Sequence, residues 1–161
     1  MKPDTNWQLL TLMVIGLLAG IVCTKKTLSD NQKKVFLSNK SWLLTNVFYQ
    51  LKSDPSGVDF TDILYKNCSL DDNYNFYEDG KFERRDSMLV CGQSYVPFGP
   101  YGRSSWNINE TFTILQVTMP LTYNFEFEIV SISNERMVLK QYLRDYLQQD
   151  IVHTFYFKAA R

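Results

Sequence analysis

The clearest pattern in the chain is an alternation of apolar and polar residues between Tyr123 and Ile129. Apolar residues occupy the odd positions of this stretch, and Asn or Glu occupies the even ones. A period of two is typical of a strand that buries one face. Similar segments follow in "RMVLKQYL" and "VHTFYFK". The second half of the chain therefore predicts antiparallel strands with one face in a core.

Turn signals separate these segments and others nearer the amino terminus. Asp79-Gly80 supplies the positive φ of a tight hairpin between two short aromatic strands. Further turns are expected at Asn109-Glu110, at residues 133–135 and at residues 145–150. Counting from Trp42 gives eight short strands, with turns at intervals of about 8 to 12 residues. This predicts an all-β, up-and-down antiparallel barrel, with a β-sandwich as the main alternative.

Three segments between the expected strands have other signatures. "DFTDILYKN", from Asp59, predicts one short helix after the first strand, with Asp59 or Thr61 as its cap. Pro55 and Gly57 indicate a turn over residues 53–59. The stretch from Gly92 to Ser105 is rich in glycine and proline and predicts a long aromatic loop, of which residues 95–101 form a candidate lid.

The aromatic residues of the strands are expected to face the barrel axis. An interior of eight strands is either just filled by side chains or holds one small ligand, and the sequence leaves both open. Candidate ligand-lining residues are Trp42, Tyr74, Phe76, Trp106, Phe112, Tyr123, Phe125, Phe127 and Phe155.

The first 23 residues read as a signal or a membrane anchor. Their apolar core runs from Leu9 to Val22, which is shorter than the roughly 20 residues that span a bilayer, and it ends at Cys23. A cysteine directly after such a core is typical of bacterial lipoprotein signals, in which it is acylated. Lys25 and Lys26 favour the alternative of an uncleaved anchor. Residues 24–39 are polar and predict a tether, and the barrel domain is expected over residues 40–161.

The three cysteines bear on the compartment. If the domain is exported, Cys68 and Cys91 can form a disulfide and Cys23 remains for lipid. If the domain is cytoplasmic, all three stay reduced. We favour export, which places the domain in the cell envelope, anchored to the membrane on the periplasmic or outer surface. A loop of about 22 residues closed by this disulfide contributes roughly 3 kcal/mol in the chain-entropy model.

Charge and residue types restrict the chemistry. The chain has 17 basic and 17 acidic residues, so no net field favours nucleic acid. His153 is the one histidine, and its alternation with Phe155 and Phe157 indicates a structural strand residue. Asp71-Asp72 is expected to be a solvated pair, and Arg84-Arg85 exposed surface charge. We therefore expect no catalytic residue, no metal site and no cofactor, and a monomeric, non-enzymatic protein.

A series of motifs in a fixed order gives a family resemblance. They are "C-x-x-D-D-x-Y-x-F-x-x-D-G-K-F" from Cys68 to Phe82, then Cys91, Gly102 with Trp106, the aromatic strand from Tyr123, and "M-V-L" from Met137. Together with Trp42 and Leu44, they resemble the bacterial lipocalin-like lipoprotein domain from about Ser41 to Lys158. Lys40 stands where classical lipocalins carry the glycine of Gly-x-Trp, so classical ligand chemistry is not carried over.

The resemblance implies a lipidated, envelope-exposed barrel. The function expected from it is binding of a small apolar or amphipathic molecule between the aromatic strands. The alternative, from a different class, is a packed barrel that serves as a structural or protein-interaction module of the envelope.

Overall fold

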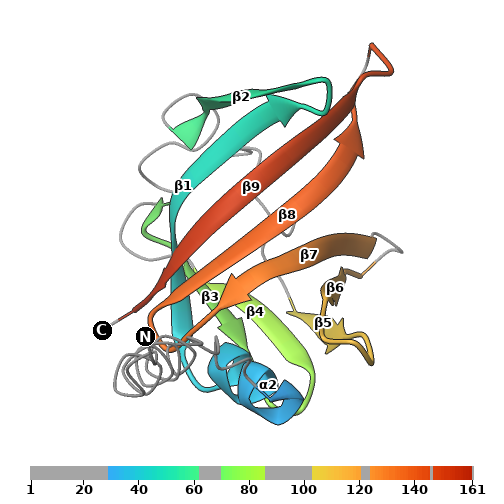
Figure 1. Ribbon diagram of the computed structural model, residues 1–161. Helices are drawn as coiled ribbons and strands as arrows, with labels where there is room; N and C mark the ends of the chain where they lie inside the picture. Colours follow the sequence, from blue (N-terminus) through green and yellow to red (C-terminus); the bar gives the residue numbers. More distant parts are fainter. Residues whose placement is uncertain (1–28, 62–69, 86–102, 121–123, 146, 161) are drawn as a thin grey trace, which may run out of the picture.

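The computed structural model describes residues 29–61, 70–85, 103–120, 124–145 and 147–160 (Figure 1). The elements are α2 (Asp30–Ser38), β1 (Ser41–Leu51), β2 (Asp54–Asp59), β3 (Asn73–Phe76), β4 (Lys81–Arg85), β5 (Arg103–Ile108), β6 (Ile114–Thr118), β7 (Asn124–Ile132), β8 (Arg136–Arg144) and β9 (Asp150–Ala159).

The strands close into an antiparallel barrel. Neighbours in the sequence pair with one another from β3 to β9, and the ring closes because β1 pairs with β3 on one edge and with β9 on the other. The β1–β9 pairing is long, from Trp42 opposite Ala159 to Leu51 opposite Ile151. The ring of β1 and β3–β9 confirms the eight strands and the up-and-down topology expected from the sequence.

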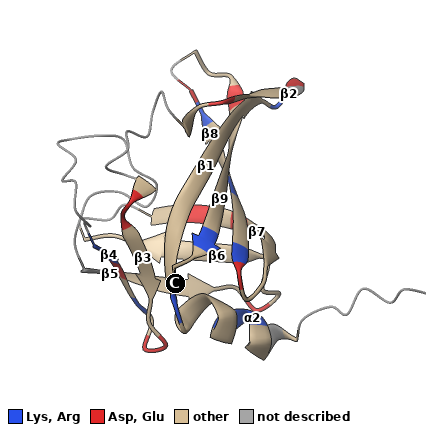
Figure 2. Ribbon diagram, turned by 90° about the vertical axis from the view of Figure 1, so that its left-hand side faces the viewer, with Lys and Arg blue, Asp and Glu red and all other residues tan. Residues whose placement is uncertain are grey.

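Strand β2 lies outside this ring and corrects the turn expected over residues 53–59. It pairs with the upper half of β1, placing Tyr49 opposite Val58, whereas β3 pairs with the lower end of the same edge (Figure 2). Within the described residues β2 has β1 as its one partner. An edge strand tolerates proline, and Gly57 adopts a φ of 61°, so the two residues that indicated a turn are accommodated in a strand.

Helix α2 corrects the tether expected over residues 24–39. Gln32 accepts a hydrogen bond from the Ser29 amide at 3.1 Å, which caps the first turn. Leu37 is only 1% exposed, and its carbonyl accepts a hydrogen bond from the Trp42 indole at 3.1 Å. Leu37, together with the partly buried Phe36, therefore docks this mainly polar helix against the end of the barrel.

The helix expected after the first strand begins near Asp59, and its residues after Thr61 lie outside the described part of the chain. At its start, the Asp59 carboxylate accepts hydrogen bonds from the Thr61 amide at 2.9 Å and the Thr61 hydroxyl at 2.6 Å. Asp59 thus makes the local bonds of a capping residue, although the helix itself stays a prediction.

The core forms as layers of residues that stand opposite one another on β1, β9 and β8. Leu44, Phe157 and Met137 form one layer, and Val47, Phe155 and Leu139 form the next. All six are at most 2% exposed. A bulge in β1 between residues 44 and 46 shifts the alternation by one, which keeps both leucine and valine on the inner face.

The docking of α2 can be tested by Leu37→Ala. We expect a loss of about 2–5 kcal/mol in the free energy of unfolding, because the substitution leaves a cavity beside Trp42. Urea unfolding followed by tryptophan fluorescence measures it. Val35→Ala is the matched control, since Val35 is 46% exposed on the same helix and should change stability by less than about 0.5 kcal/mol. Equal, small effects for both variants would contradict the packing of this helix.

Candidate functional site

The half of the barrel nearest α2 is filled by aromatic rings that touch one another. Phe76 lies 4.9 Å from Phe82 and 5.7 Å from Trp106 between ring centroids. Phe127 and Phe155 are 5.9 Å apart in an edge-to-face arrangement. These distances are those of direct aromatic packing. We call this filled half the floor of the barrel.

Most of the candidate ligand-lining residues meet in this floor. Six of these candidates are buried members of one core cluster, namely Trp42, Tyr74, Phe76, Trp106, Phe127 and Phe155. Phe125 is partly buried against that cluster, and Phe112 lies half-buried in the β5–β6 turn with a φ of 54°. Tyr123 lies outside the described residues, as do Cys23, Cys68 and Cys91 and the loop of residues 95–101. A ligand-lining role for these aromatic residues stays a prediction.

A layer of hydrogen-bonding side chains lies on the floor. Tyr49 stands opposite His153, and His153 stands opposite Gln141, so β1, β9 and β8 each place one polar group on the inner face. His153 is 5% exposed and Gln141 is 7% exposed. The Tyr49 and His153 rings are 5.6 Å apart. We call these three residues the polar layer.

The polar layer is bounded by apolar residues on both sides. Towards the floor it meets the layer of Val47, Phe155 and Leu139. In the other direction the next opposed residues are Leu51, Ile151 and Leu143. The interior therefore carries a narrow band of hydrogen-bonding groups within an apolar lining.

His153 faces the interior with Phe155 and Phe157, as its position in the sequence predicted. Its ring lies 6.0 Å from that of Phe155. Burial lowers the pKa of His153 below its ordinary value, because the charged form loses its hydration. The imidazole is therefore neutral at pH 7. Tyr49 and Gln141 were not among the candidate residues, although Gln141 was detectable as a polar residue at an inward position of "RMVLKQYL".

An ion pair on the opposite wall corrects two expectations about charge. Asp72 was expected in solvent and Arg84 on the surface, yet the two side chains are 0% and 1% exposed and bond to each other. The Arg84 Nε donates to the Asp72 carboxylate at 2.8 Å, and a second guanidinium nitrogen bonds to the same oxygen. Arg84 also lies over the Tyr74 ring at 5.9 Å. Arg85 is exposed, as expected.

The pair keeps the interior close to neutral. β4 stands four strands from β8 in the ring of eight, so Arg84 and Gln141 belong to opposite walls. A buried pair of this kind gains attraction but loses hydration, and the net contribution to stability is small. Loss of one partner alone leaves a buried charge and is strongly destabilising.

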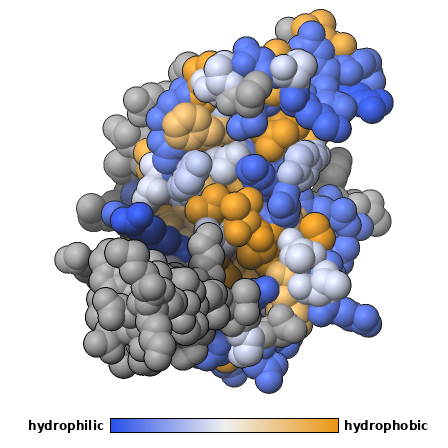
Figure 3. All heavy atoms as spheres, in the orientation of Figure 1, coloured by the Kyte–Doolittle hydropathy of each residue, from blue (hydrophilic) through white to orange (hydrophobic). Residues whose placement is uncertain are grey.

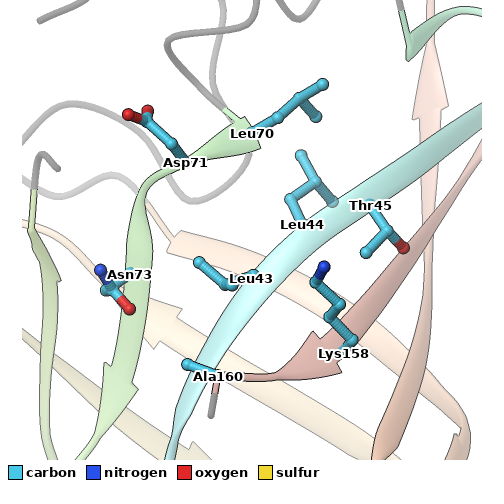
Figure 4. Close-up of a pocket in the computed structure, with 8 residues that line it drawn as sticks. All are labelled: Leu43, Leu44, Thr45, Leu70, Asp71, Asn73, Lys158 and Ala160. Carbon is cyan, nitrogen blue, oxygen red and sulfur yellow. The ribbon is translucent and has the colours of Figure 1, made fainter. Parts of the chain in front are cut away.

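A groove lies at the wall of the ring, where β1 and β3 separate (Figure 4). This groove has a volume of about 670 Å³. Its lining residues are Leu43, Leu44, Thr45, Leu70, Asp71, Asn73, Lys158 and Ala160. The described lining residues combine leucine side chains with one lysine and one aspartate, and none of them is a histidine, serine or cysteine that would act as a nucleophile or base.

The outer surface of the sheet also carries apolar side chains. Figure 3 shows them gathered in the middle of the face that looks towards the viewer. Val130 of β7 is 47% exposed, and Tyr156 of β9 is 38% exposed. Tyr142 of β8 donates its hydroxyl to the Glu128 carboxylate, and this bond raises the pKa of Tyr142.

Within the part of the chain that is described, no three His, Cys, Asp or Glu side chains are grouped so as to hold a metal ion. The helical residues described include no segment that is both long and apolar enough to cross a membrane.

Comparison with known proteins gives distant likenesses in structure alone. No protein-family model matches the chain, and no curated protein matches its sequence. Bovine odorant-binding protein in complex with a selenium-containing odorant is 14% identical, with a TM-score of 0.44 over 84% of this chain and 78% of that one. The same bovine protein with undecanal is 15% identical, with a TM-score of 0.43 over 78% and 74%. The fold assignment rests on the strand pairing of this chain itself.

The polar layer makes stability depend on pH. Because folding lowers the pKa of His153, the unfolded chain binds more protons than the folded one below about pH 6.5. We expect the thermal midpoint to be highest above pH 6.5 and to fall as the pH is lowered from 6.5 to 5. Scanning calorimetry over pH 5–8 measures this.

Since His153 is the one histidine, His153→Gln should remove the fall between pH 6.5 and 5. The carboxylates with lowered pKa values, Asp54, Asp59 and Asp79, lose their contribution only in more acid solution. An unchanged slope in the variant would show that His153 is not buried in its neutral form.

Proposed function

We propose that this chain is a non-enzymatic binding protein of the cell envelope that holds a small apolar or amphipathic molecule inside its barrel. The observation that carries the proposal is the polar layer. Gln141 and His153 are buried on the inner face between apolar layers, and side chains chosen only to fill a core would be apolar at these positions. A few polar groups in an apolar lining are typical of sites that bind small molecules.

The closed barrel is suited to such a role. The floor is rigid because its rings are packed against one another, so it can position a ligand without rearrangement. Because α2 docks at the floor through Leu37, a ligand in this proposal enters from the other end of the barrel. In this proposal the loop of residues 95–101 serves as a lid.

The filled floor supports a second candidate function. Six of the nine aromatic candidates contact one another in the core. A barrel that is also filled at the other end would be a structural or protein-interaction module of the envelope. Its apolar outer face, which includes Val130 and Tyr156, would then be the surface of interest.

Native mass spectrometry of the purified protein, joined to thermal shift with aliphatic alcohols, fatty acids and sterols, separates the two functions. We expect a co-purified molecule or a rise in thermal midpoint of several degrees, because a ligand that binds only the folded state stabilises it. Carbonic anhydrase in the same panel controls for nonspecific effects. An unliganded mass together with no shift across the panel would favour the structural module.

The envelope location is a further part of the proposal. We propose that Cys23 is lipidated, that Cys68 and Cys91 form a disulfide, and that the barrel acts as a monomer. Metabolic labelling with radioactive palmitate should mark the wild type and not Cys23→Ser. Cys68→Ser controls for labelling of another thiol and should retain the label. Label that persists in Cys23→Ser would contradict lipidation at that residue, and free thiols at 68 and 91 in non-reducing mass analysis would contradict the disulfide.

A further inference from the structure

Gln141 is a polar side chain that is largely buried inside the barrel. It follows Met137 and Leu139 on the inner face of β8, where both of those residues are 0% exposed. Its own exposure is 7%, and no hydrogen bond joins its amide to any residue within the described part of the chain. The amide nitrogen and oxygen of Gln141 are not fully buried, so they keep some access to solvent. A ligand that bonds to this amide would take the place of that solvent.

The neighbours of Gln141 restrict the charge of such a ligand. Across the polar layer, Gln141 is uncharged, His153 is held neutral by burial, and Tyr49 is a phenol. On the opposite wall, the Arg84 guanidinium is already bonded to Asp72. A carboxylate entering this interior would lose its hydration and meet no uncompensated cation among these groups.

The apolar layers restrict the orientation of the ligand. The floor side is filled by packed rings, so a hydrocarbon chain has no room there. Beyond the polar layer, Leu51, Ile151 and Leu143 supply an apolar lining towards the other end of the barrel. A hydrocarbon chain placed there would have its hydrogen-bonding end against the polar layer.

We propose that the polar layer receives the uncharged hydrogen-bonding end of an aliphatic molecule, an alcohol or a ketone, with Gln141 as its principal partner and the chain directed towards Leu51, Ile151 and Leu143. This inference rests on the proposed function and adds to it the class of ligand. It also reverses the usual expectation that a buried arginine marks a carboxylate site, because Arg84 is occupied by Asp72.

Displacement of the neutral fluorophore N-phenyl-1-naphthylamine tests the ligand class. For the full-length wild type at pH 7.5, we expect 1-dodecanol and 2-dodecanone to displace the fluorophore at concentrations at least about tenfold lower than dodecanoate. Equal or stronger displacement by dodecanoate would overturn the proposal. Absence of fluorophore binding, with no thermal shift by any of the three compounds, would instead overturn the proposed function itself.

Gln141→Leu tests the residue. We expect the affinity of the variant for 1-dodecanol, measured relative to its own affinity for the fluorophore, to fall about fivefold to tenfold, the effect of one lost hydrogen bond. Gln116→Leu is the matched control, because Gln116 is exposed on β6 between buried residues and bonds to Glu126. Unchanged affinity for 1-dodecanol in a folded Gln141→Leu variant would overturn the assignment.

Discussion

The structure depends on the pairing of β1 with β9. This pairing closes the sheet, and its register decides which side chains share a layer inside. The bulge at residues 44–46 is part of the same constraint. Without it Val47 and Tyr49 would turn outwards, and Tyr49 would no longer face His153 inside the barrel. Closure, core packing and the polar layer are thus consequences of one strand register.

Much of the fold was predictable because its signals are local. Alternation in the last strand places Phe155 and Phe157 inwards, and Gly80 adopts the positive φ of 82° expected of the β3–β4 hairpin. Such signals lie within a few residues of one another. Eight strands joined in sequence order then leave few topologies, of which the closed up-and-down barrel is one.

The features that were missed depend on contacts between distant residues. Leu37 belongs to a run of three apolar residues in an otherwise polar segment, and its role becomes apparent only once the Trp42 indole reaches its carbonyl. Asp72 and Arg84 each stand next to another residue of like charge, which suggests solvent exposure. Arg84 is buried because it faces inwards on β4 opposite Tyr74, and Asp72, directly before β3, bonds to it. For the candidate site, the aromatic wall was predictable, but Tyr49 and Gln141 required knowledge of register across three strands.

Strand β2 has a consequence for association between molecules. Closing the ring pairs both edges of its strands, but β2 lies outside the ring, and among the described residues its outer edge has no partner strand. Pro55 has no amide hydrogen to donate, and Asp54 and Asp59 place like charges at both ends of the strand. A second copy adding its own β2 alongside would bring these carboxylates together and lack part of the ladder. The proline and aspartates that made this segment resemble a turn therefore disfavour edge-to-edge aggregation of the barrel.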